Sequence, residues 1–201
     1  MVARALALAL PIAVALGCGQ QEPLPVLGTV PAFSLTERHG STVSAADLAG
    51  HVWVADFVFT RCPDICPVLS TRMASLQERL NGERLNGKLA PGDAPVRLVS
   101  ISVDPLHDTP EALAAYADHY HAGPDWLFLT GSRDTVAALL RDGFRVAFSD
   151  EGPATSPITH SDRFVLVDPQ LRIRGYYHGN DPADLARLVA DATRLRAEPS
   201  A

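Results

Sequence analysis

The sequence predicts an α/β domain in which helices flank a central mixed β-sheet. Residues 52–59 and 96–103 are nearly continuous in apolar residues, which is typical of strands that are covered on both faces. Helical patterns alternate with such runs along the chain. With 201 residues, 47% of them hydrophobic, the chain is long enough to bury one full core, and we expect one folded domain.

The first helix is predicted after the strand at 52–59. Four apolar residues recur there at helical spacing and would form one stripe facing the sheet: Leu69, Met73, Leu76 and Leu80. We expect the helix to begin at Pro67, because proline lacks an N–H and fits a first turn. Cys66 would then lie at or beside the N-cap.

The later elements follow from capping and turn signals. Thr109 and Pro110 predict the start of a second helix, and a third is expected over roughly 134–142. Two strands, 164–167 and 171–177, are joined by an Asp-Pro-Gln turn, and residues 181–195 predict a closing helix. This order fits a thioredoxin-like core with a central mixed sheet.

The N-terminus predicts export from the cytoplasm. Residues 1–17 combine one arginine with a short apolar run, as a secretory signal peptide does. Cys18 follows Ala-Leu-Gly, which resembles a bacterial lipobox, so we expect Cys18 to be lipidated and to anchor the protein to a membrane; a plain signal peptide with an incidental cysteine is the alternative. Residues 18–30 read as a flexible tether, and 31–201 as an extracytoplasmic (periplasmic) domain.

The charge of the chain argues against nucleic acid as a partner. Its formal net charge is −6, and no basic stripe interrupts that average. We therefore expect no nucleic-acid binding.

Two cysteines remain after Cys18, and their position predicts chemistry. Cys62 and Cys66 fall between the end of an apolar strand and the start of a helix, where open α/β sheets place their ligands. The helix macrodipole is expected to lower the thiol pKa and favour the thiolate, which binds soft metals. The same pair can close as a disulfide, either redox-active or merely structural.

Two acidic residues accompany the cysteines. Asp56 lies within the apolar strand, where an unpartnered charge would be costly. It is either a hydrogen-bonded structural acid or, by resemblance to the buried aspartate of thioredoxins, a proton acceptor for the cysteines. Asp64, between the cysteines, is expected to support the ligands rather than bind metal itself.

Stable Cu(II) binding would require an imidazole beside the two thiolates. Of the seven histidines, His160 is the candidate, since it lies in a Pro- and Gly-containing loop just before an apolar strand. Spacing alone leaves this assignment open. The remaining histidines are expected on the surface: His39, His51, His107, His119, His121 and His178.

Three segments resemble the Sco/SenC family of copper chaperones: FVFTRCPDICP, SVDPLHDTPEALAAYADHY and THSDRFVLVDP. The resemblance implies a thioredoxin-like fold and one copper ion, Cu(I) or Cu(II), bound by Cys62, Cys66 and His160. It also implies delivery to the dinuclear copper centre of cytochrome c oxidase subunit II, without substrate turnover. Thr159 stands where the family often has an acidic residue, so the tuning of His160 is expected to differ.

Other functions fit parts of the pattern. A low-pKa cysteine pair beside a buried acid would also suit a thiol/disulfide oxidoreductase that reduces the cysteines of the partner. A peroxidase has less support, and zinc could occupy a Cys2His site. Copper delivery without enzymatic activity is the principal hypothesis.

Overall fold

The computed structural model describes residues 22–85, 94–149 and 159–198. Its main sheet has eight strands in the order β1-β10-β9-β4-β5-β6-β2-β3. These are β1 (Gly28–Thr29), β2 (Ser34–Glu37), β3 (Thr42–Ser44), β4 (Trp53–Val58), β5 (Arg97–Ser102), β6 (Trp126–Thr130), β9 (Arg163–Val167) and β10 (Arg172–His178). β4, β5 and β6 are parallel, and the other pairs are antiparallel. β7 (Phe148–Ser149) and β8 (Thr159–His160) form a separate antiparallel pair.

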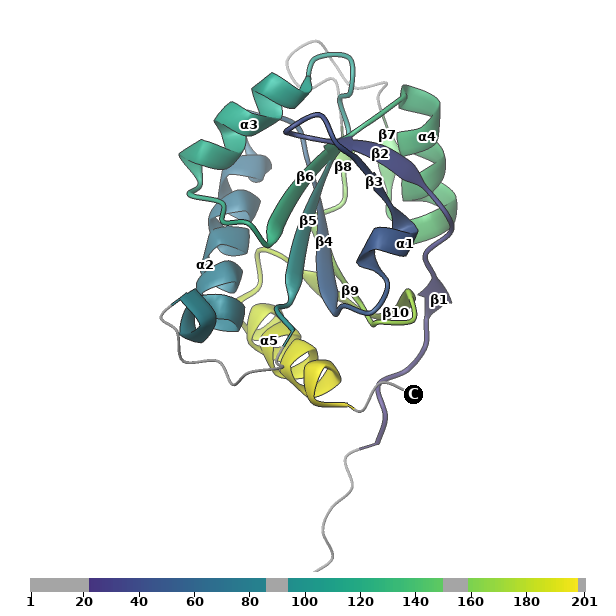
Figure 1. The fold of residues 1–201 in the computed structure, drawn as a ribbon, viewed down its shortest axis with the longest axis vertical. Coiled ribbons are helices and arrows are strands. Elements are labelled where there is room, and N and C mark those ends of the chain that lie inside the picture. Colours follow the sequence, from purple (N-terminus) through teal and green to yellow (C-terminus); the bar gives the residue numbers. More distant parts are fainter. Residues whose placement is uncertain (1–21, 86–93, 150–158, 199–201) are drawn as a thin grey trace, which may run out of the picture.

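Helices cover both faces of the sheet, so the predicted α/β architecture with a mixed sheet is confirmed (Figure 1). One face carries α2 (Ile65–Leu85), α3 (Pro110–His119) and α5 (Pro182–Ala197). The other carries α1 (Ala45–Leu48), α4 (Arg133–Ala138) and the π-helix η1 (Leu139–Phe144).

The core consists of two apolar layers, one on each side of the sheet, because successive side chains of a strand point to opposite faces. In β4, Trp53 and Phe57 pack edge-on against Phe144 of η1, with ring centroids 6.0 and 5.3 Å apart. Val54 belongs to the opposite layer. The predicted α2 stripe is buried in that layer, at Leu69, Met73, Leu76 and Leu80.

The helix starts match the sequence in two places. Pro110 is the first residue of α3, and the Thr109 hydroxyl caps it by accepting a hydrogen bond from the amide of Ala112 at 3.3 Å. The Asp181 carboxylate caps α5 in the same way, accepting from the amide of Ala183 at 2.8 Å. The predicted N-cap at Thr109 is therefore confirmed, and α5 begins where the closing helix was expected.

The prediction for the start of α2 is wrong by two residues. The helix begins at Ile65, which places Cys66 inside the first turn rather than at the N-cap. Pro67 is tolerated there because the first four amides of a helix have no intrahelical acceptor. The helix expected over 134–142 is present, but it changes to π geometry at Leu139 and ends at Phe144.

The N-terminal segment packs on the domain earlier than expected. Residues 28–29, predicted as part of the tether, form strand β1 against β10. Arg174 also donates hydrogen bonds to the carbonyls of Pro25 at 3.1 Å and Leu24 at 2.6 Å. The predicted signal segment 1–17 and Cys18 lie outside the described residues. Within the described ranges, no helix combines the length and the apolar character needed to cross a membrane.

Candidate metal centre

The two cysteines lie where β4 passes into α2. The strand ends at Val58, the helix begins at Ile65, and the connecting loop turns back at once, since the amide of Cys62 donates to the carbonyl of Phe59 at 3.1 Å. The side chain of Cys62 is partly exposed, whereas Cys66 is fully buried. Both are in the reduced form, with no disulfide between them. The loop therefore presents one accessible and one enclosed sulfur.

Burial raises the pKa of the Cys66 thiol well above its ordinary value. A hydrogen bond to Cys62 and the negative charge of Asp56 act in the same direction, and a backbone hydrogen bond at Phe59 opposes them. For Cys66, the predicted lowering of the pKa by the helix macrodipole is wrong, because desolvation of a fully enclosed sulfur outweighs the dipole. Cys66 is therefore protonated at neutral pH and must release its proton to bind a metal.

Asp56 is fully buried in β4, and a chain of hydrogen bonds across three strands holds it. The Ser100 hydroxyl of β5 donates to Oδ1 of Asp56 at 2.5 Å, and the indole N–H of Trp126 in β6 donates to the Ser100 oxygen at 2.9 Å. The structural interpretation of Asp56 accounts for these contacts. Its electrostatic effect on Cys66 also places it near the thiols, as the proton-acceptor hypothesis requires. Asp64 is exposed between the cysteines.

A second buried acid, Asp108, holds the start of the cysteine loop in place through hydrogen bonds with Thr60. Its carboxylate accepts from the Thr60 amide at 3.2 Å, the Thr60 hydroxyl at 2.7 Å and the Ser102 hydroxyl at 2.6 Å. Burial raises the pKa of this carboxyl, while these hydrogen bonds oppose the rise. Asp108 thus ties the end of β4 to the connection between β5 and α3.

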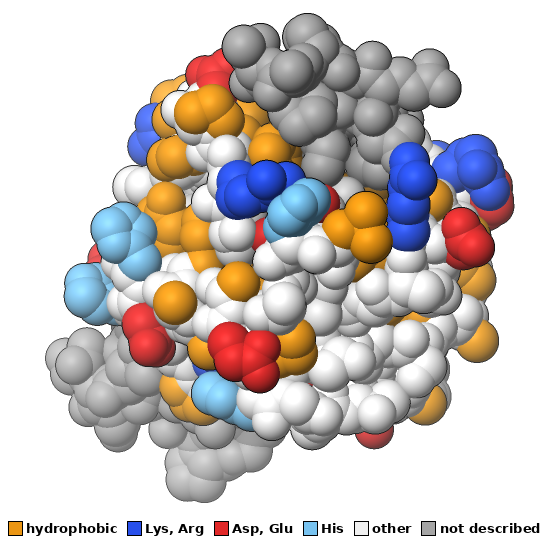
Figure 2. Space-filling view, turned by 90° about the horizontal axis from the view of Figure 1, so that it is seen from above, with side chains coloured by type: hydrophobic (Ala, Val, Ile, Leu, Met, Phe, Trp, Pro, Cys, Tyr) orange, Lys and Arg blue, Asp and Glu red, His pale blue; other side chains and the backbone are white. Residues whose placement is uncertain are grey.

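Arg61 forms a second link between the same two segments. Its guanidinium donates to Oδ2 of Asp104 at 2.8 Å, and Nδ1 of His107 lies 2.8 Å from both Arg61 Nη2 and Asp104 Oδ1. Figure 2 looks down on the end of the molecule where β7 and β8 lie in Figure 1, and basic, acidic and histidine side chains lie side by side there. His107 is half-exposed, as expected of a surface residue, but it is part of this network.

Sequence reasoning missed Asp104 and Asp108 as supports of the loop. The signal that could have found them is the position of two acids in the polar turn immediately after a buried strand that is parallel to β4. Parallel neighbours end at the same edge of a sheet, so residues after β5 lie beside residues after β4.

His160 lies in β8, where it is the register partner of Phe148 in β7. The Ser161 amide donates to the Ala147 carbonyl at 3.0 Å and continues this pairing. The side chains of His160 and Thr159 lie outside the described part of the structure. Among the side chains that are described, no group of three or more His, Cys, Asp or Glu is placed to hold a metal ion. The contribution of His160 therefore stays a prediction.

Comparison with known proteins identifies one family. The SCO1/SenC family profile matches residues 23–195. A SCO1 protein homolog of Bacillus subtilis is 33% identical over 175 residues, which cover 86% of each chain.

Solved structures agree with this match. A SCO1/SenC family lipoprotein from Bacillus anthracis has a TM-score of 0.73 and 31% identity, covering 84% of this chain and 95% of its own. BsSco has a TM-score of 0.75 and 29% identity, and the match covers 89% of this chain and 100% of BsSco. It is described as having a disulfide switch and as a member of the Sco family of cytochrome c oxidase assembly proteins. Arabidopsis thaliana ScoI with copper bound has a TM-score of 0.68 and 25% identity, and the match covers 83% of this chain and 99% of the ScoI chain. The predicted thioredoxin-like fold is thereby confirmed.

Proposed function

Since the chain belongs to the SCO1/SenC family, we propose that it binds one copper ion through Cys62, Cys66 and His160 and delivers it to the dinuclear copper centre of cytochrome c oxidase subunit II. Copper in a similar solved structure supports the choice of metal, and the description of BsSco supports a role in assembly of the oxidase. The observation that carries the proposal is the pair of reduced cysteines, one enclosed and one accessible, at the junction of β4 and α2.

The chemistry of the pair suits a carrier of copper. Thiolates and imidazole are ligands that copper prefers over harder oxygen donors. The partly exposed Cys62 would be the first sulfur to meet an incoming ion or the ligands of a recipient. Copper would then pass by ligand exchange, with no bond of a substrate made or broken, so the protein would not be an enzyme.

We also place the protein at a membrane outside the cytoplasm, through a lipid on Cys18. The N-terminal sequence supports this proposal, and a structural neighbour is described as a lipoprotein. Labelling of the protein by a radioactive fatty acid, and loss of the label in a Cys18→Ser variant, would test it.

The decisive experiment is an anaerobic titration of the reduced protein with Cu(I), then Cu(II). We expect one ion per chain, and a His160→Ala variant that loses copper to a competing chelator far more readily. His119→Ala is a matched control, since His119 is an exposed histidine on α3. Absence of stoichiometric binding, or equal losses in the two variants, would refute the Cys2His site.

A second candidate function is a dithiol reductase that prepares the cysteines of the recipient. The reduced cysteine pair with Asp56 near it supports this candidate, as does the disulfide switch described for BsSco. Here the two thiols would become one disulfide, while the partner's disulfide would gain two electrons and two protons. For such a reductase, His160→Ala would leave the rate of thiol/disulfide exchange intact, whereas Cys66→Ser would abolish turnover. A slower exchange rate in His160→Ala would exclude a pure reductase.

A further inference from the structure

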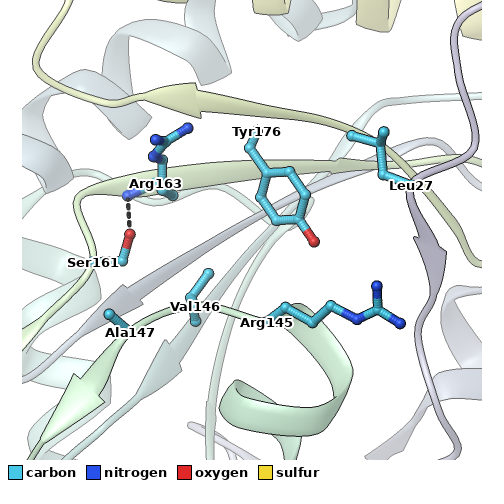
Figure 3. A pocket seen from close by; sticks show the side chains of 7 residues that line it. All are labelled: Leu27, Arg145, Val146, Ala147, Ser161, Arg163 and Tyr176. Carbon is cyan, nitrogen blue, oxygen red and sulfur yellow. Dashed lines mark hydrogen bonds between the residues drawn. The ribbon is translucent and has the colours of Figure 1, made fainter.

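A pocket with a volume of about 420 Å³ lies on the side of the domain where η1 passes into β7 and faces β9 and β10. This volume is within the range of small-molecule sites. The pocket is lined by Val146 and Ala147 on one side and by Tyr176 and Arg163 on the other, and Leu27 lies at one edge (Figure 3). It is separate from the cysteine loop, which contributes no residue to it.

The pocket holds two arginines in a chain whose net charge is −6. Figure 3 shows Arg163 and Arg145 at opposite ends of the group of side chains, with the ring of Tyr176 between them. No carboxylate of the described residues is paired with either guanidinium, whereas the neighbouring Arg141 binds Asp142 at 3.0 Å. As far as the described residues are concerned, two positive charges are thus available to a ligand.

The wall between the two arginines is apolar and fixed in place. The Tyr176 hydroxyl donates to the Phe144 carbonyl at 3.0 Å, which holds the half-buried ring against the end of η1. Arg145 follows directly with φ of 53°, a left-handed conformation that is uncommon for a residue other than glycine. Such conformations cluster at functional sites, as π-helices do. Here the turn directs the chain from η1 along the pocket.

We infer that this pocket binds a ligand with two carboxylates separated by an apolar group. Each guanidinium would pair with one carboxylate, and the apolar part would lie on Tyr176 and Val146. Either a free dicarboxylate or an acidic segment of a protein partner has this chemistry. The inference goes beyond copper binding, since none of these groups is a metal ligand.

The pocket also adjoins the strand pair that contains His160. Ser161, which lines the pocket, follows His160 directly, and its amide donates to the carbonyl of Ala147 at 3.0 Å. A bound dianion would therefore lie beside Ala147, which precedes β7, and Ser161, which follows β8.

The test is an NMR titration of the copper-free protein, in phosphate-free buffer, with linear dicarboxylates from glutarate to azelate. A second arm uses the peptide acetyl-Glu-Leu-Phe-Glu-amide and its Gln-Leu-Phe-Gln counterpart. We expect saturable shifts of the side-chain N–H signals of Arg145 and Arg163, and binding about tenfold weaker for butyrate or the glutamine peptide. Saturation by the dicarboxylates would identify a small anion as sufficient, and saturation by the acidic peptide alone would identify a protein segment.

Two variants remove the charges separately. Arg163→Gln removes one, and Arg145→Gly removes the other while suiting the left-handed backbone, so that folding is retained. Each should weaken binding about tenfold, and Arg141→Gln should not weaken it. No saturable shift with any probe, or an equal loss in Arg141→Gln, would overturn the inference. Because no copper is present, this result is independent of the copper proposal.

Discussion

The carboxylate of Asp108 binds both the amide and the hydroxyl of Thr60, two residues before the first cysteine of the pair. Asp108 is fully buried, so these hydrogen bonds form without competition from water. The loop that presents Cys62 is therefore fixed at its base by a residue from the next connection of the sheet.

Replacement of Asp108 by asparagine should destabilise the fold and loosen the metal site. The amide group places an N–H₂ opposite the Thr60 or Ser102 donors, so at least one buried donor loses its acceptor. We expect a loss of about 2 kcal/mol in the free energy of unfolding, measured in urea, and faster loss of Cu(I) to a chelator. Asp142→Asn, on an exposed ion pair, should change stability by less than about 0.5 kcal/mol. Equal effects of the two changes would contradict the role given to Asp108.

Asp104→Asn tests the other link to the loop. The Arg61 side chain that it binds is 54% exposed, so solvent screens the pair. We expect a stability loss below about 1 kcal/mol, clearly smaller than that of Asp108→Asn. A larger loss in urea unfolding would show that Arg61 and His107, rather than Asp108, hold the loop.

The two thiols should differ in reactivity. Cys62 is partly exposed, while burial raises the pKa of Cys66, so little Cys66 thiolate exists at pH 8. Iodoacetamide should modify the reduced, copper-free protein first at Cys62, and mass spectrometry of peptides would show it. In a Cys62→Ser variant, modification should be at least about tenfold slower than in Cys66→Ser. Faster alkylation of Cys66 would indicate that the loop opens readily.

Acid should weaken the fold partly through Asp168. Burial alone would raise the pKa of this carboxyl, but hydrogen bonds from Arg174 and Arg172 outweigh it and hold the pKa below its usual 3.8. A carboxyl with a lowered folded-state pKa contributes stability above its unfolded pKa and loses it as the pH falls through the folded value. As the pH is lowered below about 4, the urea concentration at the unfolding midpoint should therefore decrease in the native protein, and it should decrease less steeply in Asp168→Asn. If the urea midpoints of the two proteins decrease equally steeply with falling pH, the acid sensitivity comes from groups other than Asp168.

The sequence predicted the elements that carry strong local signals. The continuous apolar runs became β4 and β5, the N-cap predicted at Thr109 marks the start of α3, and the closing helix expected over 181–195 is α5. The short strands β1, β2 and β3 went unrecognised, because two to four residues carry no periodicity that could be told from a loop.

The site was only partly predictable for a related reason. Spacing located Cys62 and Cys66, but the pKa of Cys66 depends on burial by residues distant in the sequence, which a local dipole argument does not include. The contact between Thr60 and Asp108 spans 48 positions and follows from strand order alone. The pocket between Arg145 and Arg163 likewise requires η1 and β9 to meet.

The packing of the N-terminal segment on the domain would limit how a protein with the proposed lipid on Cys18 is oriented at a membrane. Arg174 and Arg194 bind the carbonyls of Leu24 and Glu22, which leaves three residues, and thus four Cα-to-Cα steps, between Glu22 and Cys18. Even fully extended, that length spans only roughly 14 Å. Figure 1 shows the first described residues of the chain, in purple, at the end of the domain opposite β7 and β8. A lipid on Cys18 would thus be joined to the domain by a short connection, which would keep the cysteine loop on the side of the domain that faces away from the bilayer.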